Sequence, residues 1–435
     1  MSLDTPTRTT SHERVTTSVD SPERAGAGGA RAAWLPVGAA MFTVAWGGNQ
    51  FTPLLGLYRD IDALSTGAVD LLLGAYVLGI MPALLLGGPA SDRWGRRPLM
   101  LPAPILAIIA SVLLAVGSGS PAVLFVGRIF SGLALGLAMV VGGSWIKELS
   151  SPPFDAEADA AAGARRASIS LTAGFALGAA TAAALAQFAP LPAELCYLVH
   201  LVITAASYVL LTRAPETHAA QEMPGRFLDD LRVPAAGHRR FLFVVLPMAP
   251  WVFGCAGCAY AVLPAVMGDR TGSFGIAFSG LLCLVALGCG LFIQQVGKRF
   301  DDVSSARAII IALTMTLPGL GIAALAARLV SPWLALVAAA VLGLAYGMLL
   351  VSGLQEVQRI AGPEDLAGLT AVYYSITYVY YSITYLGFFV PAALAVVSHW
   401  LSYPVMFVGG VVLAALSLGV VLMFSRKHLP TALAH

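Results

Sequence analysis

The sequence contains little charge. Asp, Glu, Lys and Arg make up 11% of its 435 residues, against about 25% in soluble globular proteins. Hydrophobic residues make up 58%, and the mean hydropathy is +0.81. The net charge of +2 indicates no basic surface for nucleic acid. This composition excludes an ordinary soluble protein and favours a membrane-embedded bundle.

Several motifs of catalytic and cofactor chemistry are absent. The chain has no Walker A loop and no H-E-x-x-H pair, and its seven histidines are scattered. The five cysteines all lie in apolar runs, so they indicate neither a disulfide framework nor a metal site. We expect no enzymatic activity, no cofactor and no metal.

Long apolar runs dominate the chain, and a membrane-spanning helix needs about 20 apolar residues. Twelve such runs occur, at approximately 34–57, 69–90, 98–117, 121–146, 166–188, 194–212, 241–264, 274–297, 307–327, 333–355, 366–391 and 403–424. They predict an all-α membrane protein with twelve transmembrane helices. Because the first run is long enough to span, we interpret it as an anchor and not a cleaved signal peptide.

Lysine and arginine are unevenly distributed between the two sides of these runs. If both termini are cytoplasmic, cytoplasmic segments hold 21 of the 25 basic residues, and only Arg59, Arg270 and Arg328 lie in external loops. This bias predicts cytoplasmic termini. We expect a disordered tail at 1–33, six-helix bundles at 34–212 and 241–424, a cytoplasmic linker at 213–240 and a second tail at 425–435.

A charged motif recurs between the apolar runs. GGPASDRWGRR at 87–97 contains Gly88, Asp92, Arg93, Gly95, Arg96 and Arg97. LFIQQVGKRF at 291–300 and the preceding Gly290 repeat the layout 202 residues later, with Gln294, Gln295, Gly297, Lys298 and Arg299. A second pair of matching segments, 132–143 and 343–354, lies 211 residues apart. Such repeats predict two related halves.

The first motif resembles the signature G-x-x-x-D-R-x-G-R-R/K between helices 2 and 3 of the major facilitator superfamily. The second resembles its weaker echo between helices 8 and 9. Arg128 and Gly132 match the family's fourth-helix motif R-x-x-x-G. The resemblance, closest to bacterial efflux members, implies two pseudo-symmetric six-helix bundles, secondary transport across the cell (plasma or inner) membrane, and a cytoplasmic latch between the halves.

The latch has candidate partners within the sequence. Glu148 ends the fourth helix on the cytoplasmic side, where the motif's arginines can pair with it. Asp92 can lie near the N-terminus of the eleventh helix, where the helix dipole favours an anion. Because Gln294 stands at the position of Asp92, with Lys298 and Arg299 following, we expect the second latch to be weaker. The alternative is a turn with arginines that only set topology.

The eleventh helix predicts a polar aromatic face, because YYSITY occurs twice in succession. Tyr374, Tyr378, Tyr381 and Tyr385 form one stripe at helical spacing. A phenol offers both a π face and a hydrogen bond, which suits amphipathic ligands. Five further residues complete the predicted substrate cavity: Asn49, Gln50, Arg128, Trp251 and Tyr346. The alternative is a polar packing seam for the stripe, and for Arg128 a side chain that reaches the outer surface.

The carrier of a coupling proton is less clear from the sequence. The first helix offers Asn49 and Gln50 in place of the acid common in drug/proton antiporters. The family's fifth-helix G-x-x-x-G-P run ends here in Ala179. Asp70, at the outer start of the second helix, and Glu356, at the inner end of the tenth, are the candidate acids. Asp70 can instead serve as a first-turn acid that favours the helix dipole.

We therefore expect a secondary transporter that exports a small amphipathic organic compound by alternating access, coupled to protons. The alternatives are a uniporter or proton symporter for a neutral or weakly anionic nutrient, and a transporter-like receptor that does not translocate. The expected partners are the substrate, protons and membrane lipid. We expect no nucleic acid and a monomer.

Overall fold

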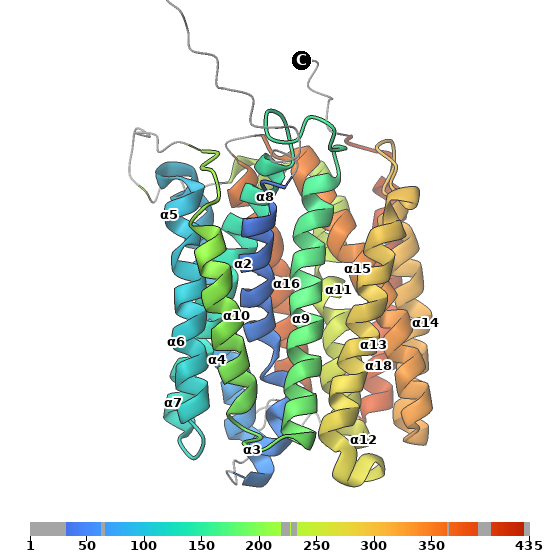
Figure 1. Ribbon diagram of the computed structural model, residues 1–435. Coiled ribbons are helices and arrows are strands. Elements are labelled where there is room, and N and C mark those ends of the chain that lie inside the picture. The colour runs from blue at the N-terminus through green and yellow to red at the C-terminus, as the bar shows by residue number, and fades with distance from the viewer. Residues whose placement is uncertain are drawn as a thin grey trace, which may run out of the picture.

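The computed structural model describes residues 32–61, 66–218, 227, 233–362, 365–389 and 402–429. The side chains of 59–61, 66–70, 73, 269, 298 and 379–389 also lie outside the described part. The described elements are helices that run side by side along one axis (Figure 1).

The first half contains six helical rods. They are α2 (Leu35–Asn49) with η1 (Thr52–Leu54) and α3 (Leu55–Ile61), α4 (Thr66–Trp94), α5 (Arg96–Met100) with α6 (Pro102–Val116), α7 (Pro121–Leu137) with η2 (Ala138–Gly142) and α8 (Gly143–Leu149), α9 (Ala162–Phe188), and α10 (Leu195–Leu211).

The second half repeats this count. A short turn, η3 (Pro234–Gly237), leads into it. Its rods are η4 (Phe241–Val245) with α11 (Leu246–Gly257), η5 (Cys258–Val262) and α12 (Leu263–Thr271), α13 (Gly275–Val296) between η6 (Gly272–Phe274) and η7 (Gly297–Phe300), α14 (Arg307–Leu329), α15 (Pro332–Ile360), α16 (Leu366–Phe389), and α18 (Tyr403–Phe424). The prediction of twelve helices is confirmed.

Several helices begin where the sequence supplies a proline. Pro102, Pro121 and Pro332 are the first residues of α6, α7 and α15, a position where the missing N–H costs nothing. The Ser331 hydroxyl accepts a hydrogen bond from the Leu334 N–H at 3.5 Å and so caps α15.

Glycines hold the helices of each half closely together. A Cβ on Gly132 would lie 2.1 Å from the Tyr76 carbonyl oxygen of α4, and one on Gly343 would lie 2.0 Å from the Ala286 oxygen of α13. Both glycines open the segments repeated 211 residues apart. The repeat therefore marks the same helix–helix contact in each half. Small residues let the two helices of each pair approach closely.

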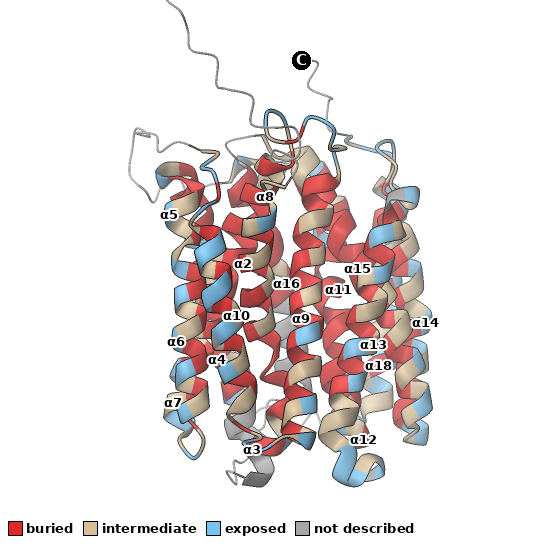
Figure 2. Ribbon diagram, in the orientation of Figure 1, coloured by how far each residue is buried: buried red, intermediate tan, exposed pale blue. Residues whose placement is uncertain are grey.

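The outward faces of the bundle are apolar. Figure 2 shows buried residues along the inside of the helices and exposed ones along the outside. Leu78, Val202, Leu416 and Trp333 are more than 60% exposed, which suits contact with lipid chains. Among the described residues, nine helices are long and apolar enough to cross a bilayer, and Leu195–Leu211 is a shorter apolar helix.

Two helix pairs join the halves. α4 packs against α16, and α9 packs against α13; Figure 1 shows the latter pair side by side. The Asn49 amide nitrogen also lies 3.4 Å from the Cys283 sulfur of α13. At the outer end, the Gln187 amide donates to the Ser273 carbonyl at 3.1 Å. The interface between the two halves, which we call the seam, is therefore closed at these contacts.

Two predicted boundaries need correction. The first helix does not run unbroken to residue 57, because α2 ends at Asn49 and Pro53 follows within a short 3-10 turn. The second helix does not end near residue 90 but continues to Trp94, so Gly88 and Asp92 are helical and only Gly95 forms the turn. The six-helix domain boundaries remain predictions, because the linker is described only in part.

Candidate transport site and cytoplasmic latch

Two irregular helical segments face each other across the seam between the halves. The first helix is interrupted after Asn49, and the seventh widens into a π-helical turn at Cys258–Val262. π-turns are rare and are frequent at functional sites. Irregular backbone within a membrane is tolerated where it is buried in protein or lines a cavity.

A small cavity lies between these two segments. Nine residues from both halves line it: Gly48, Asn49, Thr52, Tyr76, Arg128, Phe175, Phe253, Tyr260 and Tyr378. Its volume is about 20 Å³, which is room for about one water molecule. The cavity is therefore smaller than an organic ligand.

Arg128 is the charged member of this cavity. Its side chain is 1% exposed, so it does not reach the outer surface. The guanidinium carbon lies 4.1 Å from the ring centre of Tyr76 and 4.6 Å from that of Phe51, which is cation–π geometry. Its Nε donates to the Leu72 carbonyl at 3.3 Å, two residues from Asp70 on α4.

Aromatic rings from both halves line the same cavity as Arg128. The Tyr378 and Phe253 ring centres lie 4.5 Å apart, and those of Tyr378 and Tyr76 lie 6.4 Å apart in an edge-on arrangement. Phe253 also meets Phe175 of the first half at 6.2 Å. Because these rings are contributed by different helices, a shift of one half against the other would change the shape of the cavity.

Three of the predicted cavity residues, Asn49, Arg128 and Tyr378, do line this cavity. Gln50 does not: its amide donates to the Ser111 hydroxyl of α6 at 3.3 Å. Trp251 also points elsewhere, because its indole N–H donates to Ser417 of α18 at 3.0 Å. In both cases a hydroxyl on a neighbouring helix fixes the side chain away from the seam.

Two predicted tyrosines lie next to the cavity without lining it. The Tyr346 hydroxyl is 3.1 Å from that of Thr172 on α9, and its ring is 6.1 Å from Phe253. Tyr374 is fully buried beside Tyr373, with ring centres 5.3 Å apart. The side chains of Tyr381, Tyr385, Asp70 and Lys298 lie outside the described residues, so those predictions stay predictions.

The cytoplasmic motif is organised around Arg96, which is fully buried. Its Nη1 lies 2.5 Å from the Asp92 carboxylate and 2.7 Å from the Ser91 hydroxyl. Its Nη2 and Nε donate to the Glu148 carboxylate at 2.7 and 3.0 Å. Arg96 therefore joins the ends of α4 and α8, and these contacts satisfy a guanidinium that would be costly to bury alone.

The first residues of the linker lie over this cluster. The sequence did not indicate these contacts. The Glu216 carboxylate accepts from the backbone N–H of Arg96 at 3.1 Å and of Arg97 at 2.8 Å. The His218 ring Nε2 lies 2.9 Å from the Asp92 carbonyl oxygen, and Thr217 hydrogen-bonds to Glu148. These contacts tie the linker to the motif.

The two motif glycines have different tasks. Gly95 has a φ of +98°, a conformation open to glycine at little cost. Gly88 lies in the last turns of α4, where a Cβ would lie 2.9 Å from the Ala367 carbonyl oxygen. α4 therefore meets the first turn of α16, as the latch hypothesis requires, while the effect of that helix terminus on Asp92 stays a prediction.

The remaining motif residues lie around this cluster. The Arg97 Nη2 donates to the Thr212 carbonyl at 2.5 Å, and Arg93 lies half-buried in the last turn of α4. In the second motif, Arg299 is exposed within η7. Gln294 is fully buried and donates to the Thr172 hydroxyl at 2.9 Å. It thus crosses the seam from α13 to α9.

The second half has an ion-pair cluster of its own. Arg240 is buried and holds Glu356 at 2.7 Å (Nε–Oε2) and 3.0 Å (Nη2–Oε1). Arg359 joins Glu356 at 3.2 Å and Asp301 at 2.5 Å. The guanidiniums of Arg240 and Arg359 both bind the Glu356 carboxylate. This arrangement favours a structural role for Glu356 over proton transfer.

A buried polar network lies inside the first half. The His200 Nε2 lies 2.8 Å from the Thr43 carbonyl oxygen, so it carries the proton, and Nδ1 lies 2.6 Å from the Ser111 hydroxyl. A Cβ on Gly47 would lie 2.6 Å from the His200 ring. Scattered histidines in the sequence gave no signal for this network, which joins α2, α6 and α10.

Among the described residues, no group of three or more His, Cys, Asp or Glu side chains is arranged to hold a metal ion. The site therefore consists of one guanidinium, aromatic rings and amide or hydroxyl groups, with ion pairs grouped near the cytoplasmic ends of the helices.

Two sets of six helices that meet at a central interface are the arrangement known from one class of secondary transporters. The sequence model of the Major Facilitator Superfamily matches residues 37–385. This chain belongs to the major facilitator superfamily, a family of secondary transporters, and it is a multi-pass membrane protein.

Solved structures with a similar fold cover nearly the whole chain. A proton:xylose symporter, XylE, bound to 6-bromo-6-deoxy-D-glucose, has a TM-score of 0.67 at 15% identity, covering 92% of this chain and 97% of that one. The human organic anion transporter MFSD10 has a TM-score of 0.68 at 16% identity, covering 90% and 99%. At such identities the likeness shows the fold alone.

Curated relatives match only in part. The probable inositol transporter 2 of Arabidopsis thaliana is 30% identical over 93 residues, 21% of this chain and 16% of that protein. The multidrug resistance protein MdtL of Escherichia coli is 36% identical over 91 residues, 20% of this chain and 23% of that protein. The arabinose-proton symporter of Bacillus subtilis is 28% identical over 98 residues, covering 22% and 21%. The aligned segments therefore span less than a quarter of each relative.

Proposed function

We propose that this transporter exports a small amphipathic organic compound that binds with an aromatic or planar part between rings and an acceptor group at Arg128. The observation that carries the proposal is the cavity shared by both halves, where Arg128 lies between Phe51 and Tyr76 and Tyr378 approaches from the other half. Ligand pockets are typically apolar with a few placed polar groups.

The movement we propose is alternating access about the seam. The buried hydroxyls of Tyr373, Tyr374 and Ser375 have no hydrogen-bond partner among the described residues, and an unsatisfied buried polar group costs free energy. All three belong to α16, which packs against α4 of the other half. Parting of the halves would offset that cost where it brings water to α16, although the Tyr373 hydroxyl itself lies against Gly353 of α15 in the same half.

For proton coupling, we propose Asp70 over Glu356. Asp70 stands two residues before Leu72, whose carbonyl accepts a hydrogen bond from Arg128, and this position in the sequence supports the choice. Glu356 is instead bound by two arginines. Arg128 cannot carry the proton itself because a guanidinium stays charged at any accessible pH.

The direction of transport separates this proposal from its main alternative. The partial likeness to MdtL supports export. The buried Arg128 also suits a proton symporter that takes in a weakly anionic nutrient, because a guanidinium binds a carboxylate through paired hydrogen bonds.

The test uses the full chain in proteoliposomes of known orientation, with a panel of amphipathic aromatic compounds and an imposed proton gradient. If the protein is an exporter, compounds should move from the cytoplasmic side to the external side while protons move in the opposite direction. Co-movement of compound and proton would establish the symporter instead. Saturable binding without flux in either direction would point to a receptor and contradict transport.

A further inference from the structure

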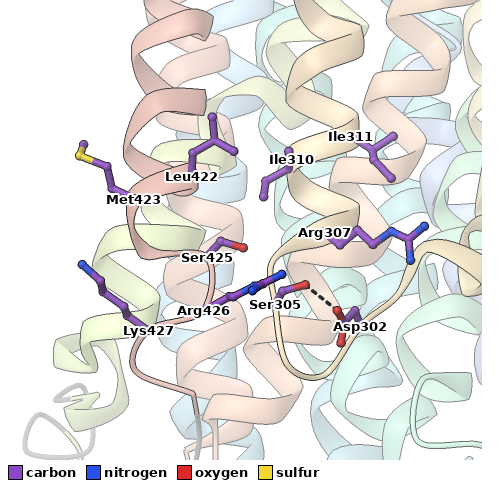
Figure 3. A pocket seen from close by; sticks show the side chains of 10 residues that line it. All are labelled: Asp302, Ser305, Arg307, Ile310, Ile311, Leu422, Met423, Ser425, Arg426 and Lys427. Carbon is purple, nitrogen blue, oxygen red and sulfur yellow. Dashed lines mark hydrogen bonds between the residues drawn. The ribbon is translucent and has the colours of Figure 1, made fainter.

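A groove lies at the cytoplasmic end of the second half, between the start of α14 and the end of α18. Its volume is about 570 Å³, far larger than the central cavity. Figure 3 shows the side chains that line it: Asp302, Ser305, Arg307, Ile310, Ile311, Leu422, Met423, Ser425, Arg426 and Lys427. None of them takes part in the transport site or the latch.

One wall of the groove is apolar and faces outward. Ile310 and Ile311 come from the first turn of α14, and Leu422 and Met423 come from the last turn of α18. Leu422 is 54% exposed and Met423 61%. Because the outward faces of these helices contact lipid, this wall continues the surface that acyl chains cover.

The other side of the groove is basic. Arg307, Arg426 and Lys427 are all exposed, and within the described residues none of the three forms an ion pair with an acidic side chain. Figure 3 places these charged side chains at the loop end of the groove and the apolar ones toward the middle of the bundle.

The acidic member, Asp302, offsets only part of this charge and interacts electrostatically with Arg307. Its carboxylate accepts hydrogen bonds from the Ser304 backbone at 2.9 Å and from the Ser304 and Ser305 hydroxyls at 2.7 Å. These bonds lower the pKa of Asp302 to about 2, and the bond from the Ser304 hydroxyl has the largest effect. Asp302 therefore stays ionised. Three cations and one anion leave the groove with a net charge of +2.

The shape of the groove is fixed by buried contacts beneath it. Arg240 Nη1 donates to the Ser425 carbonyl at 2.9 Å. The Ala306 N–H lies 3.0 Å from the Ser425 hydroxyl. These bonds hold Ala306, the residue that precedes α14, against the end of α18, so the basic side chains start from an anchored backbone.

We propose that this groove binds an anionic phospholipid of the cytoplasmic leaflet. Arg307, Arg426 and Lys427 hold the headgroup phosphate, and the acyl chains lie along Leu422, Met423 and Ile310. Basic pockets between helices at the cytoplasmic face are suited to anionic headgroups. A free phosphate has no use for the apolar wall, which is why we assign a lipid.

The test measures lipid binding by the purified full chain, without transport, using a fluorescent phosphatidylglycerol and phosphatidylcholine as the neutral comparison. We expect phosphatidylglycerol to bind about tenfold more tightly, and the triple variant R307Q/R426Q/K427Q to lose that preference. The matched control R8Q/R14Q/R24Q removes three charges from the N-terminal tail and should keep it.

Three results would overturn the proposal. They are an unchanged preference in R307Q/R426Q/K427Q, an equal loss in R8Q/R14Q/R24Q, and thermal stabilisation by inorganic phosphate or glycerol phosphate equal to that by phosphatidylglycerol. If the triple variant does not fold, the single variants R426Q and K427Q serve instead, each expected to weaken binding about three- to fivefold. An unaltered affinity in both singles would equally exclude the site.

Discussion

The cytoplasmic ends of the two halves are both held by a buried arginine, but in different surroundings. In the first half, Arg96 joins Asp92 and Glu148 at the helix that meets α16 of the other half, and the linker covers it. In the second half, Arg240 and Glu356 join helices of the same half. Both clusters therefore join helices of a single half, and the first also lies at the end of the helix that packs against α16 of the other half.

The positions of the two motifs that correspond in the repeat also have different partners. Asp92 and Gln294 are equivalent positions in the repeat, 202 residues apart. Gln294 crosses the seam with a neutral hydrogen bond to Thr172, while Asp92 belongs to a charged cluster. The relative strength of the two latches stays a prediction, which the variants below are designed to test.

The largest effect should come from breaking the cluster of the second half. Glu356→Leu leaves Arg240 buried without its carboxylate, which should cost about 3–5 kcal/mol of unfolding free energy. The double variant Arg240→Met/Glu356→Leu should recover most of the loss, because a buried pair replaced by apolar groups is often close to neutral.

Thermal unfolding of the purified protein would measure both variants, with Arg328→Ala at an exposed external position as the control. If Glu356→Leu transports normally and unfolds at the wild-type temperature, the Arg240–Glu356 pair does not hold the half together. Loss of proton coupling with stability intact would return Glu356 to the list of proton carriers.

A smaller effect is expected at the seam. Asp92→Asn should weaken the charged cluster, favour the inward-open arrangement and lower turnover by about tenfold, roughly 1.4 kcal/mol, without preventing folding. Gln294→Leu, its counterpart in the repeat, should lower turnover less because it removes one neutral hydrogen bond.

Spin-label distances between α4 and α16 on the cytoplasmic side would report the shift. Wild-type distance distributions together with normal transport in Asp92→Asn would contradict the latch. Equal effects of the two variants would contradict the asymmetry between the halves.

The smallest effect is expected from removal of the Tyr378 hydroxyl alone. Tyr378→Phe keeps the ring against Phe253 and should change substrate affinity by less than about threefold. Tyr378→Ala removes the ring and should weaken affinity about tenfold. Titration of substrate binding to both variants distinguishes stacking from packing, since equal and negligible changes would assign Tyr378 to a packing seam.

The fold could be predicted from the sequence because lipid imposes a simple requirement. Every span must be a helix of sufficient apolar length, so the lengths of the apolar runs predicted the helices. The glycines of the repeated segments lie at close contacts between helices. The pairing of Arg96 with Glu148 was also predictable, since both charges lie at the cytoplasmic ends of adjacent helices in the chain.

The cavity was predictable only in part, because in an apolar helix aromatic residues occur on every face. Which of them meet depends on how neighbouring helices are rotated. Tyr76 and Phe253 therefore gave no sequence signal, and single hydroxyls on α6 and α18 turned Gln50 and Trp251 away. Glu216 was equally hidden, because its role depends on how the linker folds back.

The central claim is that Arg128 holds the acceptor group of the substrate within an aromatic cavity. The most direct measurement is reconstituted transport by wild type, Arg128→Lys and Arg128→Ala between about pH 5.5 and 8.5. Lysine keeps the charge but loses the planar five-donor fork, so we predict that it fails almost as fully as alanine at every pH. Substantial transport by Arg128→Lys with a shifted pH optimum would mean that Arg128 only sets a local potential. Normal transport by Arg128→Ala would contradict the account.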